Sequence, residues 1–481
     1  MDSLRLMRFS YRAVLSMALA TSSYLPVAQT GHAAERPESQ QEYWARVDQK
    51  DWDAAVAAAE KLVTVARDRA RQRPLALADA LTLFADAHLG KADYAPAEAA
   101  YEEALNIVQA HVSATSSRLI EPLRGLGYSL AGAGRDAEAV PYLQRALLIT
   151  HRNQGLFDVG QRGILQQLAV SLTRSGQAAE AERQMQYLLK VDERAYGRDD
   201  PRLAPTLVRV GSWYGEIGYF QVARAYYRQA ISIVEAALGK NDLALVEPLQ
   251  ALAASYTREL LFSTLRRNTD RQRTPANADG TRSEFTMLNP RYLDSDGEAA
   301  LQRALALLEM QPTPPTDQLI DVLLQNGDWH QIKQQPENAL PFYRRAAALF
   351  DQHISRIEVP GTHSGKTEVA SIPGPLGFPV RIYYPMPIQA TRHLTLPADQ
   401  VDETFVQVEF TVTRDGTVED AKVTDRSGSE RQASEALAAI EASRFRPRFA
   451  DGEPVETTGM TNREVFRTRK TGDSDDSPEA P

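Results

Sequence analysis

Histidine is the side chain most often used for acid–base catalysis and metal binding. This chain has eight histidines, scattered along its length, and no two stand at a helical spacing that would let them hold a metal ion together. His88 and His330 fall at positions that pack between helices, and His353 and His363 flank a stretch rich in proline and glycine. We therefore predict packing or surface roles for these four histidines.

Other signatures of catalysis are missing from the sequence as well. It has no phosphate-binding glycine loop, no serine nucleophile elbow and no metalloprotease helix. It has no cysteine, which excludes thiol catalysis, disulfides and zinc–thiolate sites. Gly374 and Gly377 are separated by a proline, as in a linker, and Asp192 and Glu193 occupy a polar helix face typical of solvated side chains. The sequence predicts a non-catalytic protein with no cofactor and no metal ion.

Length, composition and net charge indicate which classes of molecule this protein can bind. The chain has 481 residues, enough for two well-formed cores, and its 43% hydrophobic and 24% charged residues are ordinary for a soluble globular protein. The formal net charge of −9 argues against nucleic-acid binding, because phosphate groups require a basic surface. We expect partners among proteins and peptides.

A repeated helical pattern would position the functional residues. A small residue is followed four positions later by an aromatic or large apolar residue and three positions after that by a small or apolar one, as in Ala97, Tyr101 and Ala104. These spacings place the three side chains on one helix face. The pattern recurs with a step of 42 residues, and 32 residues are inserted before the last two copies. Its leading residues are Ala55, Ala97, Ala139, Ala181, Ala223, Gly297 and Ala339.

Each copy follows a second apolar helix. The clearest of these helices carries Leu123, Leu126, Gly127 and Leu130. Gly134, Gly176 and Gly218 follow such helices, at a position where a left-handed residue commonly ends a helix. A small residue lets two antiparallel helices approach closely, but a single pair cannot bury its apolar face, so successive pairs stack. The sequence predicts a mainly α fold, an α-solenoid of about six to seven helical hairpins.

This pattern resembles the tetratricopeptide repeat in its 42-residue, kinesin-light-chain-like form. The segments 197–201 and 239–242 are similar to the loop between repeats of that form. The resemblance covers residues 38–352, is strongest in the central four units, and weakens in the last one, where Asn326, Gly327 and His330 replace the usual core types.

The resemblance implies a concave groove lined by the first helix of each unit. Arginine and tyrosine there can bind the carboxylates and apolar side chains of a peptide. Counting from the repeat register, the expected peptide-binding positions are Arg124, Tyr128, Gln166, Arg174, Gln250 and Arg258. The alternative for each is an ordinary exposed helix residue.

An insertion interrupts the repeats at about residues 260–296. Seven arginines fall between Arg258 and Arg291, and Pro275 and Gly280 would break a helix. The simpler interpretation is a solvated loop with some helical extension. The alternative is a lid or contact arm for an acidic partner.

The composition and the hydrophobic pattern of the sequence change after residue 352. Residues 353–383 are rich in proline and glycine and indicate an extended linker. A β-rich run at 405–412 then precedes the turn pair Asp415-Gly416 and a returning strand at 418–423. Residues 430–443 show a helical pattern, Asp451-Gly452 indicates another turn, and 460–467 is expected to be the final strand.

This order resembles the C-terminal domain of TonB, which implies a small α+β domain at residues 384–468. Tyr384-Pro385 matches its entry, and the segments 444–447 and 451–455 match the region between its helix and last strand; residues 386–403 are longer than the family pattern. TonB-like domains receive an extended peptide beside the last strand, whose unpaired backbone groups bind it. The expected strand-addition edge is Arg463, Glu464, Val465, Phe466 and Arg467. The alternative is an edge blocked by the tail or by the linker.

The two ends of the chain are expected to lie outside the folded domains. Residues 1–34 show a secretory signal peptide: arginines, an apolar stretch from Ala13 to Ala28, and small residues at a cleavage site ending at Ala33. The alternative is an uncleaved membrane anchor, against which the apolar stretch is broken by polar residues and Pro26. The acidic tail, 469–481, is expected to be disordered.

Together these features predict a periplasmic, non-catalytic interaction scaffold whose partners are proteins or peptides of the cell envelope, including outer-membrane transport proteins. The runner-up is a membrane-anchored energy transducer similar to TonB. Against that second hypothesis, the apolar leader has Ser16 but no histidine, whereas TonB meets its motor partners through a histidine and a serine. A third hypothesis is an enzyme whose site lies in the insertion or the linker.

Overall fold

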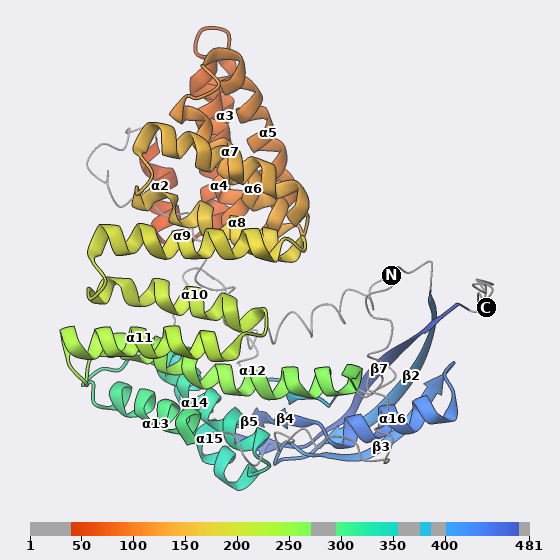
Figure 1. The fold of residues 1–481 in the computed structure, drawn as a ribbon. Helices are drawn as coiled ribbons and strands as arrows, with labels where there is room; N and C mark the ends of the chain where they lie inside the picture. The colour runs from red at the N-terminus through yellow and green to blue at the C-terminus, as the bar shows by residue number, and fades with distance from the viewer. Residues whose placement is uncertain (1–39, 271–294, 355–375, 386–400, 471–481) are drawn as a thin grey trace, which may run out of the picture. The chain divides into compact units, whose positions relative to one another are not determined.

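A computed structural model describes residues 40–270, 295–354, 376–385 and 401–470 (Figure 1). The predicted signal peptide, most of the insertion and linker, and nearly all of the tail lie outside the described residues. The chain divides between Val210 and Gly211 into two compact units, which we describe separately as unit 1 and unit 2.

Unit 1 consists of helices. In each of four hairpins the second helix packs against the first: α2 with α3, α4 with α5, α6 with α7, and α8 with α9. Short 3₁₀ turns precede α6, α8 and α10; they are η2 (Ser117–Leu119), η3 (Val159–Gln161) and η4 (Pro201–Leu203). The helices are α2 (Gln41–Asp48), α3 (Trp52–Asp68), α4 (Pro74–Gly90), α5 (Tyr94–His111), α6 (Ile120–Gly132), α7 (Asp136–Gln154), α8 (Arg162–Arg174) and α9 (Ala178–Tyr196). Helix α10 (Ala204–Glu216) crosses the boundary between the units.

Unit 2 contains the remaining helical hairpins and the β domain. Helix α12 packs against α13, and α14 packs against α15. The helices are α11 (Phe220–Leu238), α12 (Val246–Asp270), α13 (Ser295–Glu309), α14 (Thr316–Ile332) and α15 (Pro336–Ile354), with η5 (Leu243–Leu245) before α12. Because α12 continues to Asp270, the first part of the predicted insertion is a helical extension; residues 271–294 are not described.

The repeated small residues occupy equivalent places in the second helices. Ala97, Ala139, Ala181 and Ala223 each lie near the start of one, in α5, α7, α9 and α11, and each is fully buried. Gly127 shows why bulk is excluded where helices meet, because a Cβ on it would lie 2.6 Å from Cδ2 of Leu143. The predicted fold class is thus confirmed: the α-helical repeats pack as in a tetratricopeptide array.

Capping interactions repeat with the same period. Gly134, Gly176 and Gly218 have φ between 81° and 87°, the left-handed conformation expected after the first helix of a hairpin. The 3₁₀ turns begin in the same way: Asp158, Asp200 and Asp242 each accept a hydrogen bond from the backbone N–H two residues later, at 2.8–2.9 Å. The left-handed glycines and the capping aspartates therefore mark where helices end and begin, at the same positions in each repeat.

The C-terminal part of unit 2 is a small α+β domain. Strand β2 lies between β3 and β7, antiparallel to both. Two short antiparallel ribbons pair β1 with β4 and β5 with β6. The elements are β1 (Val380–Tyr383), β2 (Val401–Val412), β3 (Val418–Arg426), α16 (Glu430–Glu441), β4 (Arg444–Arg446), β5 (Arg448–Ala450), β6 (Glu453–Val455) and β7 (Thr457–Arg469).

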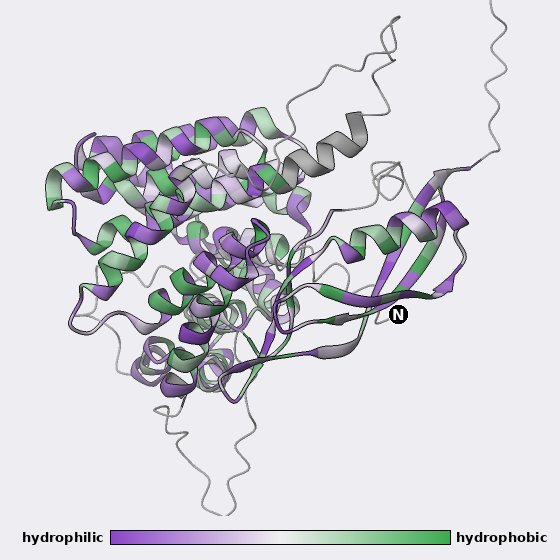
Figure 2. Cartoon of the chain, turned by 90° about the horizontal axis from the view of Figure 1, so that it is seen from below, coloured by the Kyte–Doolittle hydropathy of each residue, from purple (hydrophilic) through white to green (hydrophobic). Residues whose placement is uncertain are grey.

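One face of the sheet carries the core of this domain. Figure 2 shows α16 lying along the strands, and its alanines and Ile440 pack with alternate residues of β2, among them Val406 and Phe410, and with Phe466 of β7. Ser429 and Gln432 form a capping box at the start of α16. Several bounds differ from expectation. Val380–Tyr383, placed in the linker by the sequence, forms β1, and β2 begins at Val401 rather than at residue 405. The last strand begins three residues before Met460 and continues to Arg469.

Candidate functional site

The six expected groove residues lie on first helices: α6 carries Arg124 and Tyr128, α8 carries Gln166 and Arg174, and α12 carries Gln250 and Arg258. The first four belong to unit 1 and the last two to unit 2. Tyr128 is buried, Arg174 is exposed, and the other four are half-buried.

Arg124 is held within its own helix. Its Nε donates to Oε2 of Glu121 at 3.0 Å, and its guanidinium carbon lies 5.3 Å from the centre of the Tyr128 ring. The Tyr128 ring is only 8% exposed, so it serves mainly as packing. Arg124 is therefore already neutralised by a carboxylate, and a peptide carboxylate would compete with Glu121 for it.

A half-buried acid lies beside Arg124. Tyr101 of α5 donates a hydrogen bond to Asp86 of α4 at 2.5 Å. Burial raises the pKa of Asp86 to about 6, although the charge of Arg124 and the Tyr101 hydroxyl act in the opposite direction. The repeat pattern alone did not predict this group. Its signal was an aspartate in an otherwise apolar helix, 15 residues before a core tyrosine.

Arg174 is the most exposed of the six expected groove residues. Its Nη1 lies 3.8 Å from Oδ2 of Asp136, a buried residue at the start of α7. The other oxygen of Asp136 accepts a hydrogen bond from Ser171 at 2.9 Å, and Gln167 donates to Ser171 at 3.2 Å. The outer end of Arg174 remains in contact with solvent, so it can meet a ligand carboxylate without breaking a strong ion pair.

In unit 2, the first-helix residues adjoin a buried ion pair. Arg224 of α11 donates to Glu259 of α12 at 2.7 Å and lies 4.3 Å from the centre of the Tyr256 ring. Arg258 is close enough to Tyr227 to oppose the rise in pKa that burial gives that phenol. Gln250 lies two turns earlier on α12 and is half-buried.

Asp192 corrects an expectation from the sequence. It was expected to be solvated on a polar helix face, but its side chain is fully buried and accepts a hydrogen bond from Thr206 at 2.5 Å. Arg162 approaches its other oxygen to 3.7 Å. Asp192 is buried because a neighbouring helix covers the face that a single-helix pattern assigns to water. Glu193, beside it, is half-buried and lies 3.6 Å from Arg198.

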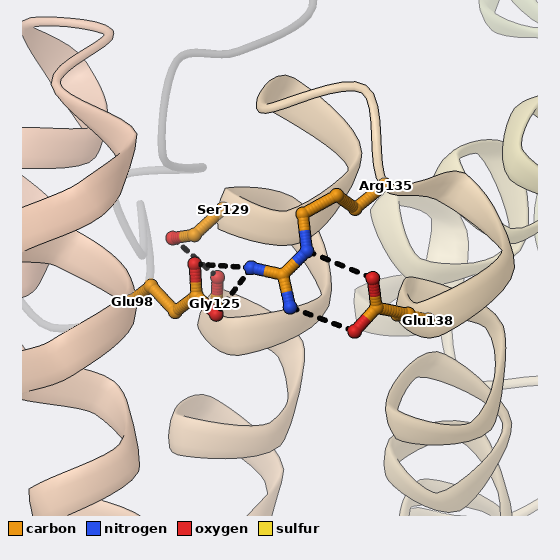
Figure 3. Close-up of polar contacts among 5 residues, drawn as sticks. All are labelled: Glu98, Gly125, Ser129, Arg135 and Glu138. Carbon is orange, nitrogen blue, oxygen red and sulfur yellow. Dashed lines mark hydrogen bonds and ion pairs between the residues drawn. The ribbon is translucent and has the colours of Figure 1, made fainter.

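An exposed arginine links successive hairpins of unit 1 (Figure 3). Arg135, which precedes α7, donates to both oxygens of Glu98 on α5, at 2.7 and 2.9 Å, and to both oxygens of Glu138, at 2.8 and 2.7 Å. The hydrogen bonds with Arg135 hold the pKa of Glu138 below its usual value. This ion-pair network lies on the protein surface and does not line a cavity.

His88 and His330 pack against aromatic side chains, as expected for histidines at positions between helices. His88 lies 4.5 Å from Phe84, ring centre to ring centre, and 3.2 Å from Asp93. His330 is 8% exposed and stacks on Phe342. Across the described ranges, no cluster of histidine and acidic side chains has the arrangement of a metal site.

Strand β7 is the second candidate site. It pairs with β2 on one side, and no other strand joins the three-stranded sheet beyond it among the residues described. Its side chains alternate between two faces, which divides the expected edge residues. Phe466 is buried in the core and Glu464 shares its face, whereas Arg463, Val465 and Arg467 point to the opposite face.

The outer face of β7 is basic with an apolar centre. The Arg463 guanidinium lies 3.5 Å from the centre of the Phe405 ring, and Arg467 donates to Glu403 at 2.9 Å. Val465 stands directly opposite Phe405 in the register. A strand beside β7 would meet two arginines flanking a valine.

The inner face of β7 is closed by residues around β1. Tyr384 donates a hydrogen bond to Glu464, and Arg381 donates to Asn462 at 3.0 Å. Burial raises the pKa of Glu464, against the effect of its hydrogen bonds with Tyr384 and Asn462 and of the charge of Arg381. The sequence identified Tyr384 as the entry to the domain but not as a partner of the last strand.

No helix within the described segments is long and apolar enough to cross a membrane.

Two family models match parts of the chain. Residues 161–236 match the tetratricopeptide repeat, and residues 402–468 match the C-terminal domain of the Gram-negative bacterial TonB protein. Both families anticipated from the sequence are therefore confirmed. No curated protein matches the chain in sequence.

Solved structures similar to this chain include helical repeat proteins. BtubC (BKLC) from P. vanneervenii is 16% identical, with a TM-score of 0.33, over 66% of this chain and 97% of that one. Nearly identical TPR-like repeats from Podosopora anserina, described as a kinesin light chain, are 15% identical, with a TM-score of 0.38, over 50% of this chain and 100% of that one. The apo form of RapI is 11% identical, with a TM-score of 0.37, over 66% and 98%.

Proposed function

We propose that this protein is a non-catalytic adaptor of the Gram-negative periplasm that holds one partner on its helical repeats and another at the edge of its C-terminal sheet. Tetratricopeptide repeats and TonB C-terminal domains are in general binding modules rather than enzymes, which supports this assignment. The observation that carries it is β7, a long strand at the edge of its sheet in a domain that matches TonB.

Strand addition follows from the chemistry of the edge. An edge strand has backbone N–H and C=O groups that a second strand can satisfy, and side chains on the two strands then lie side by side on each face. Beside Arg463, Val465 and Arg467 the best partner is an extended segment with acidic residues flanking an apolar one. The preferred ligand is therefore an acidic, alternating peptide.

A defined peptide tests the edge. We expect a synthetic peptide of alternating glutamate and valine to bind the full chain and to slow hydrogen exchange of the amides in 457–469. A matched peptide with lysine in place of glutamate should bind at least tenfold more weakly.

Variants of the protein complete this experiment. Arg463→Glu should weaken binding of the acidic peptide, whereas Arg431→Glu, an exposed change on α16, should leave it unchanged. Binding without added protection in 457–469, or equal binding by the two variants, would contradict strand addition.

Each unit's helical surface is proposed to bind a peptide by itself, through Arg124, Gln166 and Arg174 in unit 1 and through Gln250 and Arg258 in unit 2. The buried Tyr128 ring supports Arg124 from beneath rather than meeting the peptide. The exposed head of Arg174 supports this role best. Because Glu121 already neutralises Arg124, the more accessible Arg174 is expected to make the larger contribution.

Capture of partners from envelope extract compares the groove variants. Arg124→Glu combined with Arg174→Glu is expected to abolish capture while the chain remains folded. Because Arg124→Glu adds a carboxylate beside Asp86, the pair Arg174→Glu and Gln166→Ala serves as a gentler version. Normal capture by both folded double variants would remove the groove from the proposal.

Export is tested at the N-terminus of the protein recovered from Gram-negative cells. Mass spectrometry should find a chain that starts near Ala34, as expected for a cleaved signal peptide in a periplasmic protein. An intact Met1 in a membrane fraction would instead favour the anchored, TonB-like energy transducer.

A further inference from the structure

The last helical hairpin contains a polar pair that faces the C-terminal domain. Tyr343 of α15 donates a hydrogen bond to Oδ1 of Asp328 on α14 at 2.8 Å. The Tyr343 ring is fully buried, so its hydroxyl and the carboxylate meet in a site largely shielded from water. Both residues belong to unit 2.

The same pair occurs in an early hairpin, at the same positions of the repeat. Asp86 and Tyr101 in unit 1 are also 15 residues apart and also hydrogen-bonded. Asp86 and Asp328 each stand 11 residues before the leading alanine of their copy, Ala97 and Ala339, and the tyrosines stand four residues after it.

An arginine guanidinium lies beside each Asp–Tyr pair, but the element that carries this arginine differs between the two pairs. In unit 1 it belongs to Arg124, on the first helix of the following hairpin, whose charge acts on both Asp86 and Tyr101. No further hairpin follows α15 in the described chain. There the guanidinium belongs to Arg446 of β4, which donates from Nε to Oδ1 of Asp328 at 3.0 Å and from Nη2 to Oδ2 at 2.6 Å.

A second contact extends the junction. Gln331 of α14, which is 1% exposed, donates from Nε2 to the carbonyl oxygen of Asp415 at 2.6 Å. The next residue, Gly416, has φ of +81°, and a Cβ on it would lie 2.4 Å from that same Nε2. Gln331 takes a repeat position that holds Leu89, Ala131, Thr173 and Gly215 in the four central copies, so none of those copies has a side-chain amide there.

We propose that the C-terminal domain takes the place of a further repeat and caps the last hairpin. Solenoids need a terminal element that covers the open face of their last repeat. Here Arg446 supplies the cation that the next first helix would supply, and the turn at Asp415-Gly416 covers Gln331. The domain that offers a strand edge is therefore part of the fold of α14 and α15, not a separately tethered module.

If the C-terminal domain caps the last hairpin, a substitution in that domain should destabilise α14 and α15. An ion pair that loses one partner leaves the other charge buried without compensation. In the full chain, Arg446→Met should speed hydrogen exchange of amides in α14 and α15 at least tenfold, although the substituted strand lies about a hundred residues later. Arg431→Met, an exposed change in the same domain, is the matched control and should leave α14 and α15 unchanged.

Reciprocal variants guard against a simple folding defect. Asp328→Asn and Gln331→Ala alter only the helical side, and each should speed exchange at 413–417 and 444–446 in the C-terminal domain. The proposal is overturned if Arg446→Met loosens only its own domain, or if both helical variants leave 413–417 and 444–446 as protected as before. Should Arg446→Met fail to fold, the helical variants decide the matter alone.

Discussion

Tyr101 donates a 2.5 Å hydrogen bond to Asp86 across the hairpin of α4 and α5. Asp86 retains an acidic proton in the folded protein more strongly than it would in water, because burial raises its pKa to about 6. A structural acid of this kind makes stability depend on pH, and it gives a direct test of how the repeats pack.

Asp86→Asn should change that pH dependence. The folded pKa is higher than the unfolded one, so the contribution of Asp86 to stability is fully present below about pH 4 and is lost as pH rises through about 6. Relative to Asp86→Asn, the wild-type protein should therefore lose roughly 1–2 kcal/mol of unfolding free energy between pH 4 and 7.5, allowing for partial solvent access. Urea denaturation at a series of pH values measures it. The exposed change Asp53→Asn is the control, and a difference that does not vary with pH would contradict the assignment.

Ala92→Gly is expected to stabilise unit 1. Ala92 has φ of 60° at the repeat position that Gly134, Gly176 and Gly218 occupy in later copies. A side chain in the left-handed region costs about 1 kcal/mol, so glycine should raise the unfolding free energy by roughly 0.5–1 kcal/mol. The reverse change, Gly176→Ala, should lower it by a similar amount, because nothing lies within 4 Å of the added Cβ and only the backbone cost remains. Denaturant midpoints that move in the opposite directions would refute this account.

Gly127→Leu should destabilise the hairpin of α6 and α7. A Cβ at this position would already lie 2.6 Å from Leu143, so the larger side chain must force the helices apart. Overpacking of this kind costs about 1–3 kcal/mol. A thermal melt compares the variant with wild type. Gly155→Leu places the same side chain at an open position with no atom within 4 Å, so it causes no overpacking and carries only the backbone cost of a positive φ. An unchanged melting curve for Gly127→Leu would mean that the repeat register is misplaced.

Arg135→Gln should have little effect on stability despite four hydrogen bonds to Glu98 and Glu138. Arg135 and Glu138 are exposed and Glu98 is half-buried, and ion pairs that remain in contact with water contribute about 0–1 kcal/mol. We expect a loss under about 1 kcal/mol that shrinks further in 0.5 M salt. A loss of several kcal/mol, measured by urea denaturation, would show that the contact is a structural link between hairpins rather than a surface one.

The order of elements was predictable because its causes are local. The period of the leading alanines, the glycines after first helices and the Asp-Gly turns each act within a few residues of the chain. The same reasoning explains why Tyr384 was noticed at the entry of the C-terminal domain. Its bond to Glu464 was not predictable, because the two residues are 80 positions apart and meet only after β1 and β7 are in place.

Side-chain roles were harder to predict than positions. The sequence put Arg124 and Tyr128 on a first helix, where they lie, but could not reveal that Glu121 holds the arginine and that the tyrosine ring is buried. Asp192 looked solvated because a helical pattern reports one helix at a time. Its burial depends on the next helix, which brings Thr206 to it.

By itself, the sequence determined the repeat period, the two fold types and the glycines at which three first helices end, since these follow from propensities, caps and apolar spacing within one or two turns. Only the tertiary structure decided which charges are neutralised and which acids are buried. Those properties belong to neighbours that are distant in the chain. Arg446 became the partner of Asp328, 118 residues away, because folding placed a strand where another repeat would have begun.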